Sequence, residues 1–160
     1  VGTQAFADAI IDRMGQKPTT LACQDLKFKK PIILPDYQRP QREKILVGVD
    51  VFIDDRVHTP EQLGERLKEV TEGILKLKMI TNRGVKVYPE GIPDTFCTDH
   101  WRCRFISCEA QTNTIDYQPI SPKSVFELLQ ALYEGYLDAI KTENLYTFNS
   151  ERGFSLGQGE

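Results

Sequence analysis

The stretch that decides the fold is LKMITNRGVKVYPEGIPDTFCTDHWRCRF, residues 77–105. Apolar and polar side chains alternate at both of its ends, as they do in β-strands with one buried face. Between the ends lie residues 89–100, an insert rich in proline, aspartate and aromatic side chains. An insert of this length exceeds what a hairpin turn needs. The stretch therefore predicts two strands joined by an irregular connection.

Alternation predicts further strands on both sides of this stretch. Valine and isoleucine at every second position make the first of them strongly periodic. The Asn82-Arg83-Gly84 triplet predicts a turn or bulge, after which the second strand resumes. The predicted strands cover residues 45–53, 75–79 with 85–88, 101–106 and 146–148, and the glycines after residue 152 weaken the last of them.

Two helices are predicted between these strands. Thr59 at the N-cap, Pro60 at the first helical position and Gln62 at the third make a capping box, and Ser121-Pro122 opens a longer helix. Each helix carries one apolar stripe that can pack on a sheet. The stripes are Leu63, Leu67, Val70 and Ile74 in the first helix, and Val125, Leu128, Leu129, Leu132, Tyr136 and Ile140 in the second.

The order strand, helix, strand, strand, helix, strand predicts an α+β fold, a ferredoxin-like βαββαβ two-layer sandwich over residues 45–160. One sheet face would pack on the helices, and the other would be left open. Before it, residues 1–15 predict a short helix that ends at Gly15 and is marginal in isolation. Residues 16–44 predict an extended, proline-rich linker whose apolar residues drape over another surface; these are Leu26, Phe28, Ile32, Ile33 and Leu34.

Composition narrows the class of function. A net charge of -3 argues against a general binder of nucleic acid or anionic membranes. We find neither a membrane-spanning run nor a signal-peptide pattern, and the four cysteines predict reduced thiols of a cytoplasmic protein. A chain that begins with Val1 and leads at once into a helix predicts a piece of a longer protein.

The sharpest chemical candidate is a zinc site made of Cys97, His100, Cys103 and Cys108. Strand alternation argues against it, because Cys103 and Cys108 are an odd number of residues apart and would face opposite sides. Buried or half-buried thiols are the competing interpretation. We therefore assign no metal ligand.

Two Asp-His pairs and one glycine cluster are the remaining candidates for a catalytic, metal or phosphate-binding site. His100 beside Asp99 has the composition of an oriented general base, but no recognisable nucleophile accompanies it. Asp54, Asp55 and His58 precede a predicted helix and suit its positive N-terminal end better than a metal. The glycines at the C-terminal end of the chain are followed by no helix, so they do not predict a phosphate-binding loop. We assign no catalytic and no cofactor-binding residue.

The last prediction is a partner-facing surface made of four basic residues. Alternation places Lys76, Lys78, Arg102 and Arg104 together on the open sheet face, as a candidate partner-facing surface. RNA binding is an alternative, but Phe52 is the one plausible stacking platform on that face and the RNP1 pattern is absent. The competing interpretation is a solvated or partner-facing charged surface on which Asp50 is close enough to pair with some of the cations.

Several segments, in this order, resemble one family. GVDVF (48–52), LKM (77–79), NRG (82–84), VYP (87–89) and DHWRCRF (99–105) are similar to the extra C-terminal domain of a subset of bacterial-type isocitrate dehydrogenases. The opening GTQAFADAIIDRMG is similar to the last helix of the catalytic domain in that class, and the closing FSLGQGE to its C-terminus. The linker and residues 109–120 carry no such likeness.

The resemblance implies a parent enzyme that oxidises and decarboxylates isocitrate to 2-oxoglutarate with NAD(P) and Mg or Mn. It also implies a non-catalytic, ferredoxin-like domain that serves dimer assembly, stability or regulation, with the upstream catalytic domain and a second subunit as partners. The family's catalytic, metal and cofactor motifs lie upstream and match no position here. Two alternatives stay open: a stand-alone ferredoxin-like module that binds a small effector near residues 88–100, and a zinc-bearing binding domain.

Overall fold

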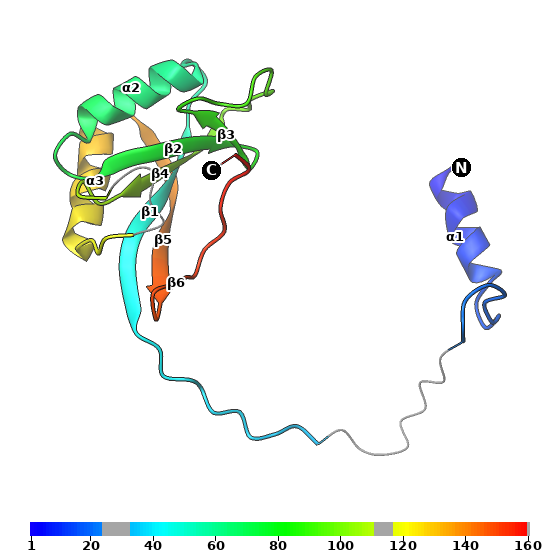
Figure 1. Cartoon of the computed structure of the whole chain (residues 1–160). Coiled ribbons are helices and arrows are strands. Elements are labelled where there is room, and N and C mark those ends of the chain that lie inside the picture. Colours follow the sequence, from blue (N-terminus) through cyan, green and yellow to red (C-terminus); the bar gives the residue numbers. More distant parts are fainter. Residues whose placement is uncertain (24–32, 111–116, 160) are drawn as a thin grey trace. The chain divides into compact units, whose positions relative to one another are not determined.

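The computed structural model describes residues 1–23, 33–110 and 117–159 (Figure 1). The chain divides into two compact units, residues 1–39 and residues 40–160. Across the described ranges the structure contains a six-stranded antiparallel sheet and three helices, a mixed α and β architecture.

The first unit contains the helix α1 (Thr3–Ile11). It ends four residues before the predicted end at Gly15, and a turn continues to Gly15, whose φ of +81° is the left-handed conformation that glycine adopts without strain. The described linker residues are exposed, Ile33 and Leu34 among them. The predicted apolar residues Leu26, Phe28 and Ile32 lie outside the described residues, so the draped linker stays a prediction.

The second unit is built on the sheet, and the predicted strands are confirmed. Three of them are longer than predicted, 85–88 has the predicted bounds, and the strand predicted from Leu75 begins at Lys76. Neighbouring strands lie in the order β3-β2-β4-β1-β5-β6, and every pair is antiparallel. Residues 77–105 contribute to β2, β3 and β4, and His100 is already part of a strand. The strands are β1 (Lys44–Asp54), β2 (Lys76–Asn82), β3 (Val85–Tyr88), β4 (His100–Ile106), β5 (Asp138–Phe148) and β6 (Glu151–Arg152).

Two helices cover one face of this sheet, α2 (Pro60–Val70) and α3 (Pro122–Glu134) (Figure 1). The predicted capping box is confirmed: the Thr59 hydroxyl accepts from Gln62 N–H, and the Gln62 side chain accepts from Thr59 N–H at 2.9 Å. The Ser121 hydroxyl likewise accepts from the backbone of Lys123. Both helices thus begin where their sequence signals predict.

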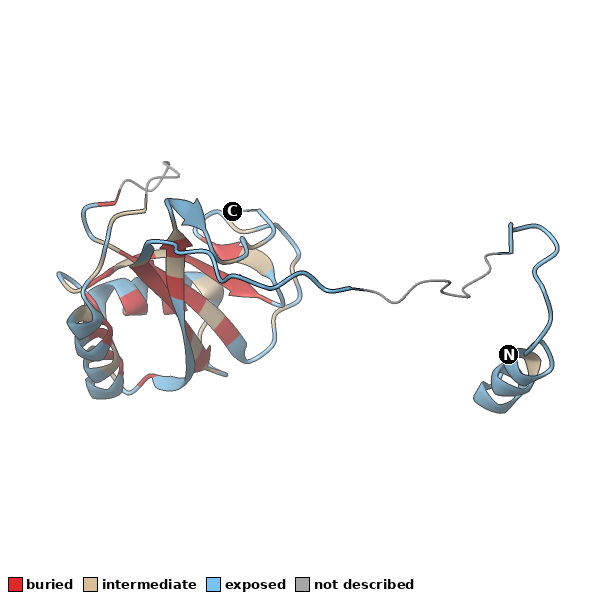
Figure 2. Ribbon diagram, turned by 90° about the horizontal axis from the view of Figure 1, so that it is seen from below, coloured by how far each residue is buried: buried red, intermediate tan, exposed pale blue. Residues whose placement is uncertain are grey.

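The hydrophobic core lies between these helices and the sheet, where buried residues concentrate (Figure 2). From β1 it receives Val49, Val51 and Ile53, and from β4 it receives Trp101, Cys103 and Phe105. The helices contribute Leu63 and Leu67 from α2, and Val125, Leu128 and Leu132 from α3. Alternation along β1 and β4 therefore assigns one face to this core and directs the intervening side chains to the other face.

Three predicted helix positions are wrong. Ile74 follows the end of α2, although its side chain still packs against the core. Tyr136 and Ile140 lie beyond α3, which ends at its C-cap Gly135. Tyr136 adopts a left-handed φ of +58°, and Ile140 belongs to β5. The strand β5 was predicted too short, as residues 146–148. Residues 138–144 are all exposed, so no buried face imposes alternation on them.

The sheet face opposite the helices is not left open, contrary to the prediction. After β6 the chain runs across this face as a strap, residues 154–158, to the edge at β3 (Figure 1). There Lys86 N–H donates to the Gln158 carbonyl, and Gln158 N–H donates to the Gly84 carbonyl, both at 2.9 Å. No sequence pattern predicted this covering segment, because its glycines recur without any apolar periodicity.

We expect Gly64→Ala to destabilise the second unit. A Cβ at this α2 position would lie 2.5 Å from the Tyr88 ring, which caps the core beside the helix. Alanine normally stabilises a helix by about 1 kcal/mol relative to glycine, whereas overpacking costs about 1–3 kcal/mol. Urea unfolding, followed by fluorescence of the single tryptophan, measures the net change in the free energy of unfolding. Glu69→Ala, at an exposed position of the same helix, is the control and should change little. A gain in stability for Gly64→Ala would contradict the close contact.

Candidate functional site

A buried ion pair lies at the centre of the strap-covered face. Asp50 on β1 and Arg104 on β4 are directly opposite in the strand register, and each side chain is at most 2% exposed. Arg104 Nε donates to Asp50 Oδ1 at 2.8 Å, and its Nη2 donates to Oδ2 at 2.9 Å. This two-bond geometry is the strongest form of arginine–carboxylate pairing. The pairing of Asp50 with cations belonged to the competing interpretation of this face, and the structure shows it as a buried pair and not as a solvated one.

Aromatic rings and the strap seal this pair from water. The Phe154 ring lies 5.0 Å from the Arg104 guanidinium, and the Ser155 carbonyl accepts from Arg104 Nη2 at 3.1 Å. Tyr117 packs edge-on against Phe154 with ring centroids 5.1 Å apart, and its hydroxyl accepts from Lys78 Nζ at 3.3 Å. The sequence signals missed Tyr117 and Phe154, because each is a single aromatic residue outside any periodic segment.

The four predicted basic residues differ in their surroundings. Arg104 is buried in the pair with Asp50, and Lys78 contacts Tyr117. Arg102 is mostly buried, with its Nε 3.6 Å from Asp50 Oδ2. Lys76 is half-buried and lines a groove of about 380 Å³ beside α2. The structure therefore brings three of the four around Asp50 and its covering rings, and places Lys76 apart from them.

A small pocket opens at one end of the same face. It is lined by Phe52, Thr81, Arg83, Gly84, His100 and Arg102, and its volume is about 190 Å³. Its walls come from β1, β2, β4 and the turn between β2 and β3. The His100 ring lies 5.5 Å from Phe52, while Asp99, its predicted partner, faces Arg56 at 3.6 Å. The Asp99–His100 pair is thus not assembled as an oriented base.

The cysteines of the proposed zinc set are dispersed. Cys103 is fully buried in the core, Cys97 is half-buried and Cys108 is exposed. Burial raises the pKa of the Cys103 thiol far above its usual range, which keeps it protonated. Within the described ranges no group of three or more His, Cys, Asp and Glu side chains could hold a metal ion. This arrangement offers Mg, Mn or zinc no set of ligands there.

Asp55 and His58 form a turn that precedes α2. Asp55 Oδ1 accepts from the backbone N–H groups of Val57 and His58, and Oδ2 lies 2.8 Å from His58 Nδ1. Burial raises the pKa of Asp55, but these hydrogen bonds from His58 and Val57 outweigh it and hold the pKa below its usual value. The pair shapes the entry to the helix.

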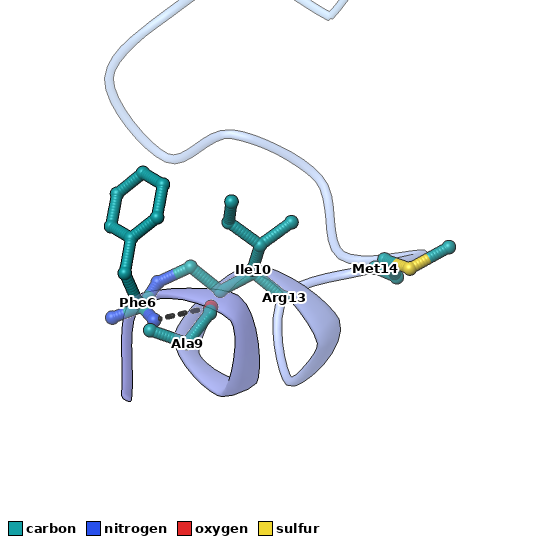
Figure 3. A pocket seen from close by; sticks show the side chains of 5 residues that line it. All are labelled: Phe6, Ala9, Ile10, Arg13 and Met14. Atoms are coloured by element: carbon teal, nitrogen blue, oxygen red, sulfur yellow. Dashed lines mark hydrogen bonds between the residues drawn. The ribbon is translucent and has the colours of Figure 1, made fainter. Parts of the chain in front are cut away.

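The first unit carries a separate apolar surface on α1 (Figure 3). Phe6, Ala9, Ile10, Arg13 and Met14 line a shallow depression of about 470 Å³. No residue of α1 is buried, and Phe6 and Met14 are 63% and 74% exposed. Helices this short are marginal in water without tertiary packing. Within the described part of its own unit, α1 thus has no surface on which to bury this face.

Comparison with known proteins shows the family of this chain. The sequence profile described as bacterial isocitrate dehydrogenase, C-terminal domain, matches residues 44–160, which is the sheet unit from the start of β1. This match covers well over half of the chain. The chain belongs to that family. The predicted resemblance is therefore confirmed.

Individual relatives extend the likeness to the first unit. The isocitrate dehydrogenase [NADP] of Rickettsia bellii is 34% identical over 163 residues, which cover 100% of this chain and 32% of that enzyme. The enzyme of the same name from Rickettsia prowazekii is 36% identical, with 100% and 32% covered. That of Thermus thermophilus is 33% identical, with 99% and 31% covered. The chain thus spans about a third of the length of these relatives.

A solved structure gives the same result. The crystal structure of the TT0538 protein from Thermus thermophilus superposes with a TM-score of 0.62 and 28% sequence identity. The superposition covers 100% of this chain and 31% of that protein. The likeness therefore includes α1 as well as the C-terminal domain. In the ranges that the structure describes, no helix of this family member is long and apolar enough to cross a membrane.

Asp50→Asn should destabilise the C-terminal domain strongly. The substitution keeps the volume but removes the charge that pairs with the buried Arg104 guanidinium and lies 3.6 Å from Arg102 Nε. Breaking a buried ion pair by removing one charge costs about 3–5 kcal/mol. The free energy of unfolding in urea, measured by Trp101 fluorescence, checks this. Asp138→Asn at an exposed position of β5 is the control, and a loss below about 1 kcal/mol for Asp50→Asn would refute the central role of the pair.

Proposed function

We propose that this chain is the C-terminal accessory part of an NADP-dependent isocitrate dehydrogenase. In this proposal the parent enzyme oxidises isocitrate and decarboxylates it to 2-oxoglutarate. The exposed apolar face of α1 carries the proposal, because it needs a surface that the described chain does not offer. The relatives, which are three times as long as the matched region, contain enough additional chain to form that surface.

We assign α1 to the last helix of the upstream catalytic domain, residues 16–44 to an extended linker and the sheet unit to a non-catalytic domain. The NADP, and the Mg or Mn of the reaction, would bind in the upstream domain. The described residues do not fit a metal ion, and the sequence has no glycine-rich phosphate loop. Four free cysteines suit a reducing compartment such as the cytoplasm.

We infer a ferredoxin-like topology for the sheet unit. Leaving out the short strands β3 and β6, the elements follow the order β1, α2, β2, β4, α3, β5. In space these four strands lie as β2-β4-β1-β5, all antiparallel, with both helices on one face. A split βαβ arrangement has this order, so the added strands are extensions at the two edges.

We propose that the domain also assembles a homodimer through β5. This strand pairs with β1 along its whole length, but with β6 only at Thr147 and Phe148. Its residues 138–144 therefore form an exposed edge that can pair with another strand. The helix α3, which contacts β5, and the following turn carry large exposed side chains: Phe126 at 72%, Tyr133 at 81% and Tyr136 at 97%. Aromatic residues of this kind are enriched at protein interfaces.

Charge favours a second copy of the chain as the occupant. If two β5 strands pair antiparallel about Thr142, Lys141 of one copy lies opposite Glu143 of the other, and the reverse. Lys141 and Glu143 already form an ion pair within one chain. Pairing them across the two copies therefore keeps the number of ion pairs the same. A two-fold axis through Thr142 satisfies the isologous symmetry of a dimer. Lys76, half-buried beside α2, remains a candidate contact for the catalytic domain.

The accessory role predicts that the purified 160-residue chain does not produce NADPH from isocitrate. The assay records NADPH absorbance with Mg²⁺ or Mn²⁺ at saturating substrate. The full-length parent enzyme, purified in the same way, is the positive control and should turn over. Turnover by the 160-residue chain would overturn this proposal.

The dimer predicts a mass in sedimentation equilibrium near twice that of one chain. The double variant Tyr133→Glu with Tyr136→Glu should shift the equilibrium to monomer, because it places two charges in the proposed contact. Tyr37→Glu is the matched control, since Tyr37 is equally exposed but lies in the first unit. A monomeric wild-type chain, or equal dissociation by the control, would count against pairing through β5.

A further inference from the structure

The strap, residues 154–158, contacts the sheet through polar and aromatic groups but faces solvent along much of its length (Figure 1). Ser155, Leu156 and Gln158 are exposed, and Phe154 is half-buried. The hydrogen bonds of the strap to β3 lie at the edge of the sheet, where water competes for the same groups. A segment with few buried apolar side chains and solvent-exposed hydrogen bonds opens at a lower free energy than the core does. The strap has both properties.

The strap also lies against polar atoms that have no hydrogen-bond partner. Arg102 Nε and Nη2 are buried without such a partner among the described residues. Asp50 Oδ2 lies 3.6 Å from Arg102 Nε, which is too long for a hydrogen bond. On the strap side, a Cβ at Gly157 would lie 3.5 Å from Arg102 Nη2. Because a buried donor without a partner costs its full desolvation, closure of the strap carries a penalty that is removed when water reaches Nη2.

The fit of the strap requires the absence of a side chain at Gly157. A Cβ there would lie 2.8 Å from Thr81 Cγ2 and 3.6 Å from Met79 Cε. Thr81 and Met79 belong to β2 and are each 1% exposed, so the close-packed sheet leaves them little room to move away. One added methyl group at this position is therefore enough to lift the strap from the sheet.

We propose that residues 154–158 are a latch, which opens and closes while the sheet beneath it stays folded. Phe154 against Arg104 and Gln158 on β3 hold the closed state, and the unpaired nitrogens of Arg102 oppose it. The open state uncovers the β3 edge, whose backbone groups can then pair with another extended segment. The latch goes beyond the accessory role and does not depend on it.

Hydrogen exchange of the 160-residue chain, measured for each amide by NMR, tests the latch. Lys86 N–H donates to the Gln158 carbonyl and Gln158 N–H to the Gly84 carbonyl, so exchange of both amides requires the strap to open. After correction for intrinsic rates, we expect both to exchange at least about tenfold faster than the amides of the central strand β4. Equal rates at the strap and in β4 would mean that the strap opens only when the whole domain unfolds, which contradicts the proposal.

Gly157→Ala is the variant that lifts the strap. It should speed the exchange of Lys86 at least about tenfold and change β4 less, because the added methyl group clashes only in the closed state. Gly2→Ala is the matched control, since a Cβ there meets nothing within 4 Å, and it should exchange as the wild type does. An unchanged Lys86 rate in Gly157→Ala would refute the latch.

Arg102→Met tests the opposite direction. It removes the buried nitrogens that lack partners, so it should slow the exchange of Lys86 severalfold relative to β4. The β4 rates in the same spectra report the stability of the whole domain and so separate strap opening from global unfolding. Unchanged or faster exchange of Lys86 relative to β4 would refute the part assigned to Arg102.

Discussion

The carboxylate of Asp50 is the constraint on which the strap-covered half of the domain depends. A charge buried this deeply is costly unless it is paired and hydrogen-bonded, and Arg104 supplies both requirements. The pair also fixes the register of β1 against β4. A slip of one residue would turn Asp50 into the core between Val49 and Val51 and separate its carboxylate from Arg104. The helix-covered face makes no such demand, because its apolar residues gain similar energy in several arrangements.

The sequence was informative wherever one face of an element is buried and the other is not. The capping box at Thr59 and the Ser121-Pro122 signal located both helix starts, because these motifs satisfy backbone groups locally. Alternation located β1, β2 and β4, because the core selects every second residue. The same alternation placed Arg102 and Arg104 on the face that carries Asp50, and pairing with Asp50 was the competing interpretation of that face.

The rest of the site depends on contacts between distant segments, which no local pattern records. Arg104 was expected to face a partner, since alternation specifies a face but not what covers it. Phe154 and Tyr117 provide the cover from irregular segments that are remote from Arg104 in sequence. Arg83 was noticed only as part of a turn, and its place beside Arg102 follows from the β2–β4 pairing. The sequence of residues 138–144 did not indicate a strand for a related reason. These residues are exposed, so no buried face imposes alternation on them.

The strap has a consequence for the order of events during protein synthesis. Ribosomes deliver a chain from its N-terminus, and domains fold as units as they emerge. All the strands of this sheet leave the ribosome before residues 154–158 do. Until those residues arrive, Asp50, Arg102 and Arg104 remain hydrated and the β3 edge lacks its Gln158 contact. The domain therefore acquires its sealed form only after every strand has been made, when residues 154–158 become available to close it.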